Sequence, residues 1–430
     1  MKPCARDIAV GAVAALLLLV PACSADAPPE TDPASNSDPK QLDMNEVERL
    51  RALGYVNVAP ALPPDASVGV LTHDTERAGQ GLTLFTNAKF CSTQLIDMQG
   101  RVLNSWSEEP CFRWGNVALL HSGELLVVVR TPHEERPQSA LENRFLMQLK
   151  WDGELVWKKQ LPVHHDVELA PNGRIMTLTY ALRVIPEVDP EIPVRDNSVA
   201  MLDERGELLD EVSLWEVLRS APELFTLQEG KVRNFEGGRE VDLFHSNSVE
   251  WIRWPELIGT HPIYGPDSVL ICVRNQDTLA IFDWKTKKLL WAWGQGELSG
   301  PHDATLLPSG HILAFDNGLG RDYSRIVEVD PLTDEIVWEY RAAEPQSFYS
   351  MARGANQRLA NGNTLVTESD DGRLFEITSE GEVVWEFLNP NMTDKREPSV
   401  IVRARRIEGL NYEELVERIE SGRGLPSVVD

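Results

Sequence analysis

Residues 304–340 read ATLLPSGHILAFDNGLGRDYSRIVEVDPLTDEIVWEY, and this stretch decides the fold. It contains four runs rich in β-branched and large apolar residues, which are ATLLP, HILAFD, RIVEVD and EIVWEY. Turn residues such as Ser309-Gly310 and Thr333-Asp334 separate the runs. Four short strands within roughly 47 residues are typical of one blade of a β-propeller.

The last strand of this unit has counterparts along the chain. Each counterpart is a mostly apolar run after a turn, and the six runs end at or surround Trp106, Trp157, Val212, Trp293, Trp338 and Trp385. Six copies predict an all-β fold, a six-bladed β-propeller with four-stranded blades over residues 67–410. The regular spacing is interrupted by about 30 extra residues around 213–242. This helix-containing insertion is either a lid at the rim or a surface excursion without a role.

Two histidines occupy the same step of the repeat. The segment His165-Asp-Val-Glu-Leu-Ala-Pro-Asn-Gly aligns without a gap with His302-Asp-Ala-Thr-Leu-Leu-Pro-Ser-Gly, and His245 opens a more divergent copy. Two other copies carry Gly115 and Gly354 at this step, each eight residues before a turn glycine. Because glycine satisfies the fold there, the histidines indicate chemistry at positions that a propeller brings together.

A structural role is the alternative for each histidine, since a single histidine in a propeller strand usually bonds to a neighbouring blade. Three histidines around one axis also fit a zinc site, but Arg274 nearby would repel a cation, so we assign no metal ligand. Calcium bound at the axis by turn carboxylates is the alternative. His164 should face away from the site because neighbours on a strand point to opposite faces. Surface or turn positions are expected for His73, His121, His133, His261 and His311.

The first residues predict export. Lys2 and Arg6 precede an apolar run from Ile8 to Val20, which is short for a membrane span and suits a secretory signal over residues 1–22. The run leads into Val-Pro-Ala-Cys23, which is lipoprotein-like. Cys23 would then carry the lipid that anchors the protein in the cell envelope, facing the periplasm or exterior, with the outer membrane favoured if the cell has one. Ordinary cleavage after a small residue is the alternative.

Residues 23–66 are rich in Pro, Ala, Asp and Ser, which predicts a disordered spacer with a short helix at 44–56. Residues 411–430 should form a C-terminal helix and tail. The strand-like run SVIVRARRI just before them could close the ring by completing a terminal blade.

Composition limits the partners and the redox chemistry. The chain has 41 basic and 67 acidic residues, a net charge of −26, which argues against nucleic acid. Any anionic substrate must therefore be bound by local positive charge. No CxxC pair is present, which disfavours a zinc ribbon or thiol oxidoreductase. In an oxidising compartment Cys91 and Cys111 could bridge strands of the first blade and leave Cys272 buried, but spacing alone does not decide the pairing.

From about Gly79 to Pro390 the chain resembles the bacterial arylsulfotransferase (aryl sulfate sulfotransferase) family, which comprises exported six-bladed propellers. The segments that carry the resemblance are HHDVELAPNG (164–173), FHSNSVEW (244–251), SVLICVRNQDTLAIFDW (268–284), GPHDATLLPSGHILAFDNG (300–318) and LANGNTLVTESDDGRLFEITSEGEVVWEF (359–387). Members transfer a sulfuryl group from an aryl sulfate to a phenolic acceptor without a nucleotide donor or cofactor. This chain lacks room for the family's N-terminal β-sandwich domain and looks closer to a shorter branch.

The resemblance implies a site made of His302, His245, His165 and Arg274, in which His302 is the nucleophile that becomes sulfated. Sulfuryl transfer between similar phenols suits a ping-pong mechanism through one covalent intermediate, a sulfohistidine. Arg274 would hold the sulfuryl oxygens with bidentate donors. The other two histidines would act as acid, base or oxygen ligand. Asp303, or a partner elsewhere, would orient the ring of His302.

Two other functions fit parts of the sequence. A non-catalytic propeller lipoprotein of the same descent could bind a sulfated or anionic ligand. A quinone-dependent dehydrogenase-like propeller shares tryptophan-rich repeats, but such folds usually have eight blades, and only six markers are present here.

Overall fold

The structure is a computed structural model that describes residues 61–132, 143–235 and 238–425 of the 430-residue chain. The expected signal peptide, Cys23 and the spacer up to residue 60 lie outside the described residues. None of the helices in the described part is long and apolar enough to cross a membrane.

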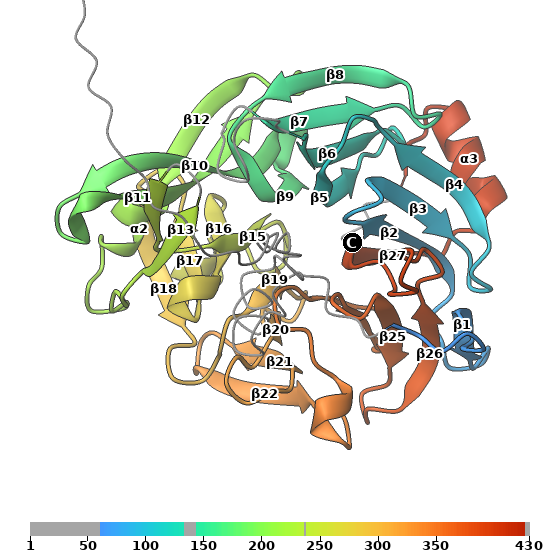
Figure 1. Cartoon of the computed structure of the whole chain (residues 1–430). Coiled ribbons are helices and arrows are strands. Elements are labelled where there is room, and N and C mark those ends of the chain that lie inside the picture. Colours follow the sequence, from blue (N-terminus) through green and yellow to red (C-terminus); the bar gives the residue numbers. More distant parts are fainter. Residues whose placement is uncertain (1–60, 133–142, 236–237, 426–430) are drawn as a thin grey trace, which may run out of the picture. The chain divides into compact units, whose positions relative to one another are not determined.

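Six sheets, antiparallel except for one strand pair in the third blade, surround a common centre, as the sequence predicted (Figure 1). Each sheet runs from an innermost strand near the centre to an outermost strand at the rim. The three blades built from four strands in sequence order are β5 (Arg113–Leu119), β6 (Leu125–Arg130), β7 (Arg144–Leu149) and β8 (Leu155–Gln160); β15 (Ser246–Trp251), β16 (Ser268–Val273), β17 (Thr278–Asp283) and β18 (Lys288–Trp293); and β19 (His302–Leu306), β20 (Ile312–Asp316), β21 (Arg325–Asp330) and β22 (Glu335–Tyr340).

The ring closes through both ends of the described chain. The C-terminal strand β27 (Ile401–Glu408) pairs with β2 (Gly81–Asn87) and becomes the innermost strand of the blade that continues with β3 (Ser92–Ile96) and β4 (Val102–Ser107). The strand β1 (Gly69–His73) adds to the rim of the last blade, whose strands are β23 (Ala355–Arg358), β24 (Thr364–Glu368), β25 (Arg373–Ile377) and β26 (Val383–Leu388). Helix α3 (Tyr412–Glu420) follows β27 and has an asparagine capping box.

The tryptophans of the outermost strands explain why their pattern recurs. Indole Nε1 of Trp106 donates to Lys150 O, in the outer turn of the next blade, at 3.0 Å. Trp385 donates in the same way to Met98 O at 3.0 Å, across the point where the ring closes. The other two such pairs are Trp291 with Asp334 and Trp338 with Ser379. Each bond satisfies an indole N–H and ties a blade to its neighbour.

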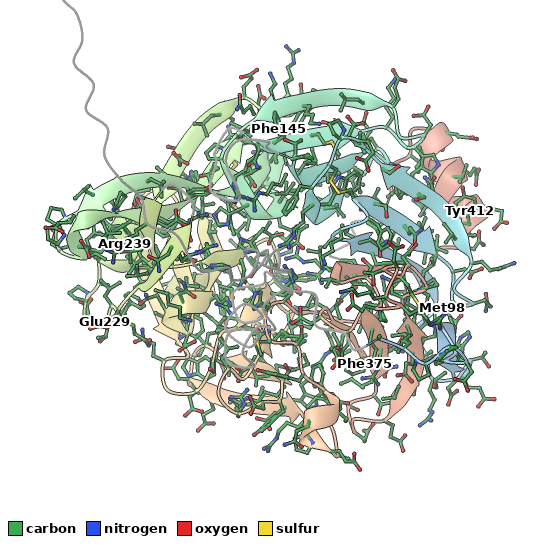
Figure 2. All side chains as sticks on the ribbon, viewed as in Figure 1. Met98, Phe145, Glu229, Arg239, Phe375 and Tyr412 are labelled. Carbon is green, nitrogen blue, oxygen red and sulfur yellow. A yellow bond between two sulfur atoms is a disulfide. The ribbon has the colours of Figure 1, made fainter. Side chains whose placement is uncertain are left out.

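Apolar side chains fill the space between neighbouring blades (Figure 2). The inner strands are buried on both faces because each sheet packs against the blade before it and the blade after it, whereas outermost strands such as β8 and β12 are largely exposed. Phe375 is fully buried between two blades, and Met98 is nearly so. The inner strands therefore read as almost continuous apolar runs.

The insertion around 213–242 belongs to the third blade. That blade contains β9 (Val163–Leu169), β10 (Ile175–Ile185), β11 (Asp189–Leu202) and β12 (Leu208–Ser213). Helix α2 (Leu214–Leu218) follows, capped by the Ser213 hydroxyl, and buries its leucines in the core. The hairpin of β13 (Lys231–Phe235) and β14 (Gly238–Asp242) then extends the sheet, with β14 parallel to β11. The insertion is thus integrated into the sheet.

Single turns of 3₁₀ helix connect several strands. They span Pro171–Gly173, Pro262–Tyr264, Arg274–Gln276 and Pro345–Ser347. The third of these, directly after β16, positions Arg274.

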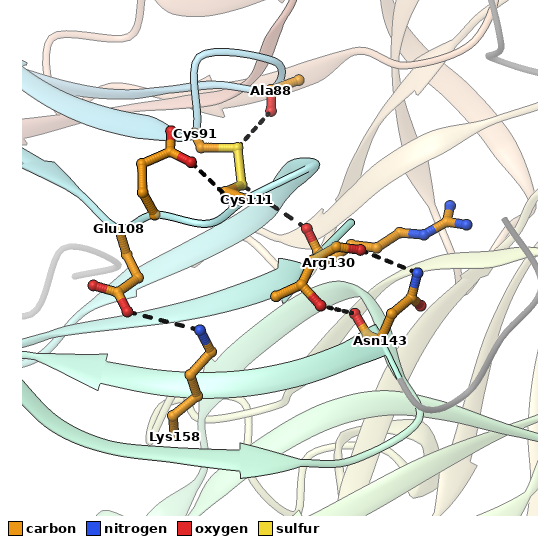
Figure 3. The surroundings of a disulfide bond; sticks show 9 residues. Ala88, Cys91, Glu108, Cys111, Arg130, Asn143 and Lys158 are labelled. Carbon is orange, nitrogen blue, oxygen red and sulfur yellow. Dashed lines mark hydrogen bonds and ion pairs between the residues drawn. A yellow bond between two sulfur atoms is a disulfide. The ribbon is translucent and has the colours of Figure 1, made fainter. Parts of the chain in front are cut away.

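A disulfide joins Cys91 and Cys111, which answers the question that spacing left open (Figure 3). Cys91 lies in the turn between β2 and β3, whereas Cys111 lies in the connection from β4 to the next blade. The expectation that the bridge would join strands of the first blade is therefore wrong, because it links that blade to the segment that enters the second. Cys272 is free and buried on β16, as expected.

Candidate functional site

A cavity of about 590 Å³ lies where the six blades converge. Each blade contributes to its wall through the innermost strand or the residue next to it. These contributions are Gly115, His165, Asn247, His302, Gly354 and Arg403. The repeat step identified in the sequence therefore faces a common cavity, and His165, His245, His302 and Arg274 all line it.

His164 lines the same cavity, so the expectation that it faces away is wrong. The reason is a register shift in β9, where pairing with β10 jumps between His164 and Val167. Such a β-bulge re-aims side chains that a regular strand would send to opposite faces. Within it His165 has a φ of 57°, and His245 on the next blade has a φ of 50°. Positive φ is uncommon for residues other than glycine and marks these two positions as unusual.

The ring of His302 is fixed by two acceptors. Its Nδ1 lies 2.7 Å from Asn317 Oδ1 and 3.1 Å from Gly300 O. The amide nitrogen of Asn317 donates to the carbonyls of Ser350 and Arg353, so its oxygen is the end that faces His302. Nδ1 must therefore carry the proton, which leaves the lone pair on Nε2.

His302 is neutral at any ordinary pH. Burial, together with the positive charge of Arg274, lowers its pKa to about 3. Asp303 does not orient the ring through any hydrogen bond of the described residues, since its carboxylate binds Arg403 and Arg405. Of the two alternatives from the sequence, the orienting partner is the one elsewhere, Asn317.

His245 is paired with a carboxylate. Its Nδ1 lies 2.6 Å from Asp242 Oδ2, which also accepts from Arg233 at 3.3 Å. Burial lowers the pKa of His245, and Asp242 opposes that shift. Burial alone would raise the pKa of Asp242, but His245 and Arg233 lower it well below its usual value. This pair can accept a proton on Nε2 and hold the resulting imidazolium.

His164 and His165 form a second oriented pair. His164 Nε2 lies 3.1 Å from Thr179 O, so Nε2 donates and Nδ1 accepts. His165 Nδ1, 2.7 Å away, must then donate, which leaves a lone pair on its Nε2. Burial is the main reason why the pKa of each ring is well below its ordinary value, so both are neutral. The rings of His165 and His245 are 4.9 Å apart.

Arg274 is positioned by a hydrogen bond to Asn275. Its Nη1 donates to Asn275 Oδ1 at 3.1 Å, and Asn275 in turn is bonded to the backbone of Asp242 and Phe244. The side chain is 4% exposed, and burial lowers its pKa from a value so high that it stays charged. A guanidinium fixed in this way can present preorganised donors to an anion in the cavity.

The cavity is strongly basic in an acidic protein. Its lining includes two carboxylates, Asp242 and Asp303, against ten basic side chains. These are Lys89, Arg113, Arg130, Arg144, Arg195, Lys231, Arg233, Arg274, Arg353 and Arg403. The local positive charge that an anionic substrate would need is therefore present in this cavity, in a protein with a net charge of −26.

An ion-pair cluster forms one wall of the cavity. Arg403 on β27 lies 2.8 Å from Asp166 and 2.8 Å from Asp303. Both aspartates directly follow the aligned histidines His165 and His302, so the repeated His-Asp pair was a signal for this cluster. Asp303 and Arg403 also line a second cavity of about 270 Å³, which includes Trp254 and other residues outside the first. The cluster thus separates two cavities.

The structure also bears on a metal site and on the remaining histidines. Among residues 61–132, 143–235 and 238–425, no group of three His, Cys, Asp or Glu side chains could hold a metal ion. His121 bonds to Leu425 O, and His311 pairs with Glu328, both outside the cavity lining. His133 lies outside the described residues. The functional candidates that the sequence did not supply are Asp242, Asn317, Arg144 and Arg403.

Comparison with known proteins gives one family and several similar folds. The chain matches none of the curated proteins with which it was compared. A protein of unknown function from Bacteroides caccae is similar at 14% identity over 76% of this chain and 98% of that chain, with a TM-score of 0.47. A catalytically inactive virginiamycin B lyase from Staphylococcus aureus with quinupristin is similar at 12% identity over 75% and 88%, with a TM-score of 0.42. A family model described as arylsulfotransferase (ASST) matches residues 145–390, more than half of the chain.

Proposed function

Because the chain belongs to the arylsulfotransferase family, we propose that it transfers a sulfuryl group from an aryl sulfate to a phenolic acceptor through a sulfohistidine at His302. The observation that carries this proposal is the state of His302. It is a buried, neutral imidazole whose lone pair is on Nε2, in a basic cavity that Arg274 also lines. A neutral imidazole is a good nucleophile, and a sulfated one is a good leaving group.

In the first half-reaction Nε2 of His302 attacks the sulfur of the aryl sulfate. The N–S bond forms as the bond between sulfur and the phenolic oxygen breaks, and the phenolate leaves with the electron pair. In the second half-reaction a phenol loses its proton to a base and attacks the same sulfur, which breaks the N–S bond and restores His302. One cavity serves donor and acceptor in turn, which is a ping-pong mechanism.

The neighbouring side chains divide the remaining work. Arg274 holds the sulfuryl oxygens, whose charge is redistributed as the sulfur moves between oxygen and nitrogen. His245 takes the proton of the acceptor phenol on Nε2, because Asp242 stabilises the imidazolium that forms. His165 lies beside it and acts as a second oxygen ligand or base through its own Nε2.

The test is intact-mass spectrometry of the protein after exposure to 4-nitrophenyl sulfate. We expect release of one equivalent of nitrophenol and a protein heavier by one sulfuryl group, which peptide mapping places on His302. Addition of phenol should remove the group. The alternative, a propeller lipoprotein that only binds a sulfated or anionic ligand, predicts binding of the aryl sulfate without release of nitrophenol or any change in mass.

We also propose that the protein is exported and anchored in the cell envelope through a lipid on Cys23. The apolar run that ends in Val-Pro-Ala-Cys23 supports this, and the disulfide between Cys91 and Cys111 fits an oxidising compartment. Replacement of Cys23 by Ala should move the protein from the membrane fraction to the soluble fraction. Unmodified Cys23 in a soluble, exported product of the natural sequence would contradict the anchor.

A further inference from the structure

Arg144 stands at the start of β7 and reaches into the cavity beside His164. Its Nη1 donates to Val163 O at 3.2 Å, one residue before His164. Its guanidinium lies 5.1 Å from the ring centre of Tyr180, and that of Arg195 lies 4.0 Å from the same ring. Two guanidinium groups thus share one aromatic ring at this side of the cavity.

The neighbouring Arg195 and Arg233 pair with carboxylates, whereas Arg144 pairs with none among the described residues. Arg195 donates to Glu240 through Nε at 3.0 Å and Nη2 at 2.6 Å. Arg233 lies 3.7 Å from Glu240 and 3.3 Å from Asp242. Arg144 forms no ion pair with any carboxylate of the described residues, and its buried Nε has no hydrogen-bond partner there. Burial lowers its pKa, Tyr180 opposes that shift, and Arg195 and Arg233 add to it.

Arg144 is half-buried, with its Nε shielded from solvent, and a cation in such a place loses hydration that no partner repays. Arg144 lies next to two further arginines and has no carboxylate partner in the described part of the chain, so an anion at this side of the cavity would supply a counter-charge. The side of the cavity at Arg144 and the side at Arg274 are distinct, because different cations act on the histidines at each. The cations with the largest effect on His164 are Arg144 and Arg195, whereas the cation with the largest effect on His302 is Arg274.

A row of neighbouring histidine rings runs from the side of the cavity at Arg144 toward the side at Arg274. His164 and His165 are 5.0 Å apart between ring centres, and His165 and His245 are 4.9 Å apart. We infer that Arg144 binds a second anionic group, a carboxylate or sulfate, on the same aryl sulfate whose sulfuryl group lies at His302 and Arg274. The substrate class is therefore an aryl sulfate with an additional acidic substituent. This inference rests on the proposed sulfuryl transfer.

The experiment compares two donors that differ in charge and little in shape, 4-sulfooxybenzoate and 4-sulfooxybenzamide, together with their meta isomers. We expect wild-type protein to favour the carboxylate by about 10- to 100-fold in kcat/KM, the range for a buried hydrogen bond to a charged group. Arg144→Met keeps the apolar stem and should abolish this preference while the amide loses less than about 3-fold. Arg174→Met, on an exposed arginine, is the matched control and should keep the preference.

Three outcomes would overturn the inference. One is equal kcat/KM for acid and amide in wild-type protein for both isomers. Another is an equal loss for acid and amide in Arg144→Met, because a purely structural role of Arg144 would affect both. The third is the same preference in Arg144→Met as in Arg174→Met.

Failure of the proposed function gives a different result. If neither donor is turned over and no sulfation is found, calorimetric titration with the same acid and amide still tests the second anion position. Tighter binding of the acid to wild-type protein, lost in Arg144→Met, would support Arg144 as an anion ligand without sulfuryl transfer. Equal binding of the two compounds would contradict it.

Discussion

Three blades carry histidine at the repeat step and two carry glycine, and the two groups differ in what occupies the space. A Cβ on Gly354 would lie 2.4 Å from a ring carbon of Phe315, which is paired with His302 in the register of β19 and β20. A Cβ on Gly115 would lie 3.1 Å from Val128 and 3.3 Å from His165 O. The glycines therefore leave room for residues that support His302 and His165. The place of each of these two histidines in its blade therefore depends on the absence of a side chain in a neighbouring blade.

The largest expected effect on activity comes from substitution of a histidine at the repeat step, His302. His302→Ala should lose both half-reactions, release of nitrophenol from 4-nitrophenyl sulfate and transfer to phenol, since no sulfated species can form. Intact mass and nitrophenol release measure this, with His311→Ala outside the cavity as the control. If His302→Ala still gains a sulfuryl group, His165 is the next candidate, because its Nε2 also has a lone pair.

The second effect concerns the two other histidines. His245→Ala and His165→Ala should lower turnover by about 10²- to 10⁴-fold, the usual value of acid–base help, but a slow sulfation of His302 should remain. His245 should show the greater loss in transfer to the acceptor, since it alone is paired with Asp242. Single-turnover kinetics separate the two half-reactions. Complete absence of sulfation in either variant would move the nucleophile away from His302.

The third expected effect is a loss of turnover in Arg274→Lys. A lysine keeps the charge but loses the planar, preorganised donors, so turnover should fall by about 10²-fold or more. Thermal unfolding should be nearly unchanged. Arg174→Lys is the control for loss of a guanidinium at an exposed position. Unchanged activity in Arg274→Lys would place Arg274 among purely structural arginines.

Substitution of a glycine at the repeat step should have a smaller effect, which is on the stability of the fold. Gly354→Ala forces a side chain against Phe315 at a φ of 152°, so we expect a loss of about 2–3 kcal/mol in the free energy of unfolding. Gly153→Ala is the matched control, because Gly153 also has positive φ, at 86°, but no atom lies within 4 Å of its added Cβ. Urea denaturation should show the smaller loss for Gly153→Ala. Equal losses would mean that backbone strain, and not the contact with Phe315, sets the requirement for glycine.

The propeller architecture could be predicted from the sequence because the strand and turn patterns of one blade recur along the chain. Six outer-strand patterns predicted six blades, and the tryptophans in four of them each tie their blade to the next. The repeat alignment also predicted that His165, His245 and His302 share one cavity. Their chemical roles stay predictions.

The partners of these histidines could not be predicted in the same way. Asp242 comes from an insertion without a counterpart in other blades, and Asn317 from a loop after β20. His164 escaped prediction because a bulge breaks the alternation of the strand. Long-range partners of this kind depend on how blades meet, which local periodicity does not encode.

The smallest expected effect tests whether His302 is neutral. Its pKa is about 3 in the folded protein and about 6.5 in the unfolded chain, so only the unfolded state binds a proton between these values. Stability from this residue is fully present above pH 6.5 and is lost as the pH falls toward 3. His302→Gln removes the titration, so from pH 7 to pH 5.5 the wild type should lose about 1 kcal/mol relative to this variant. The comparison of the two proteins cancels every other titrating group that the substitution leaves unchanged. Urea denaturation at both pH values measures the difference, and a constant gap between the two proteins would mean that His302 is not held neutral by the cavity.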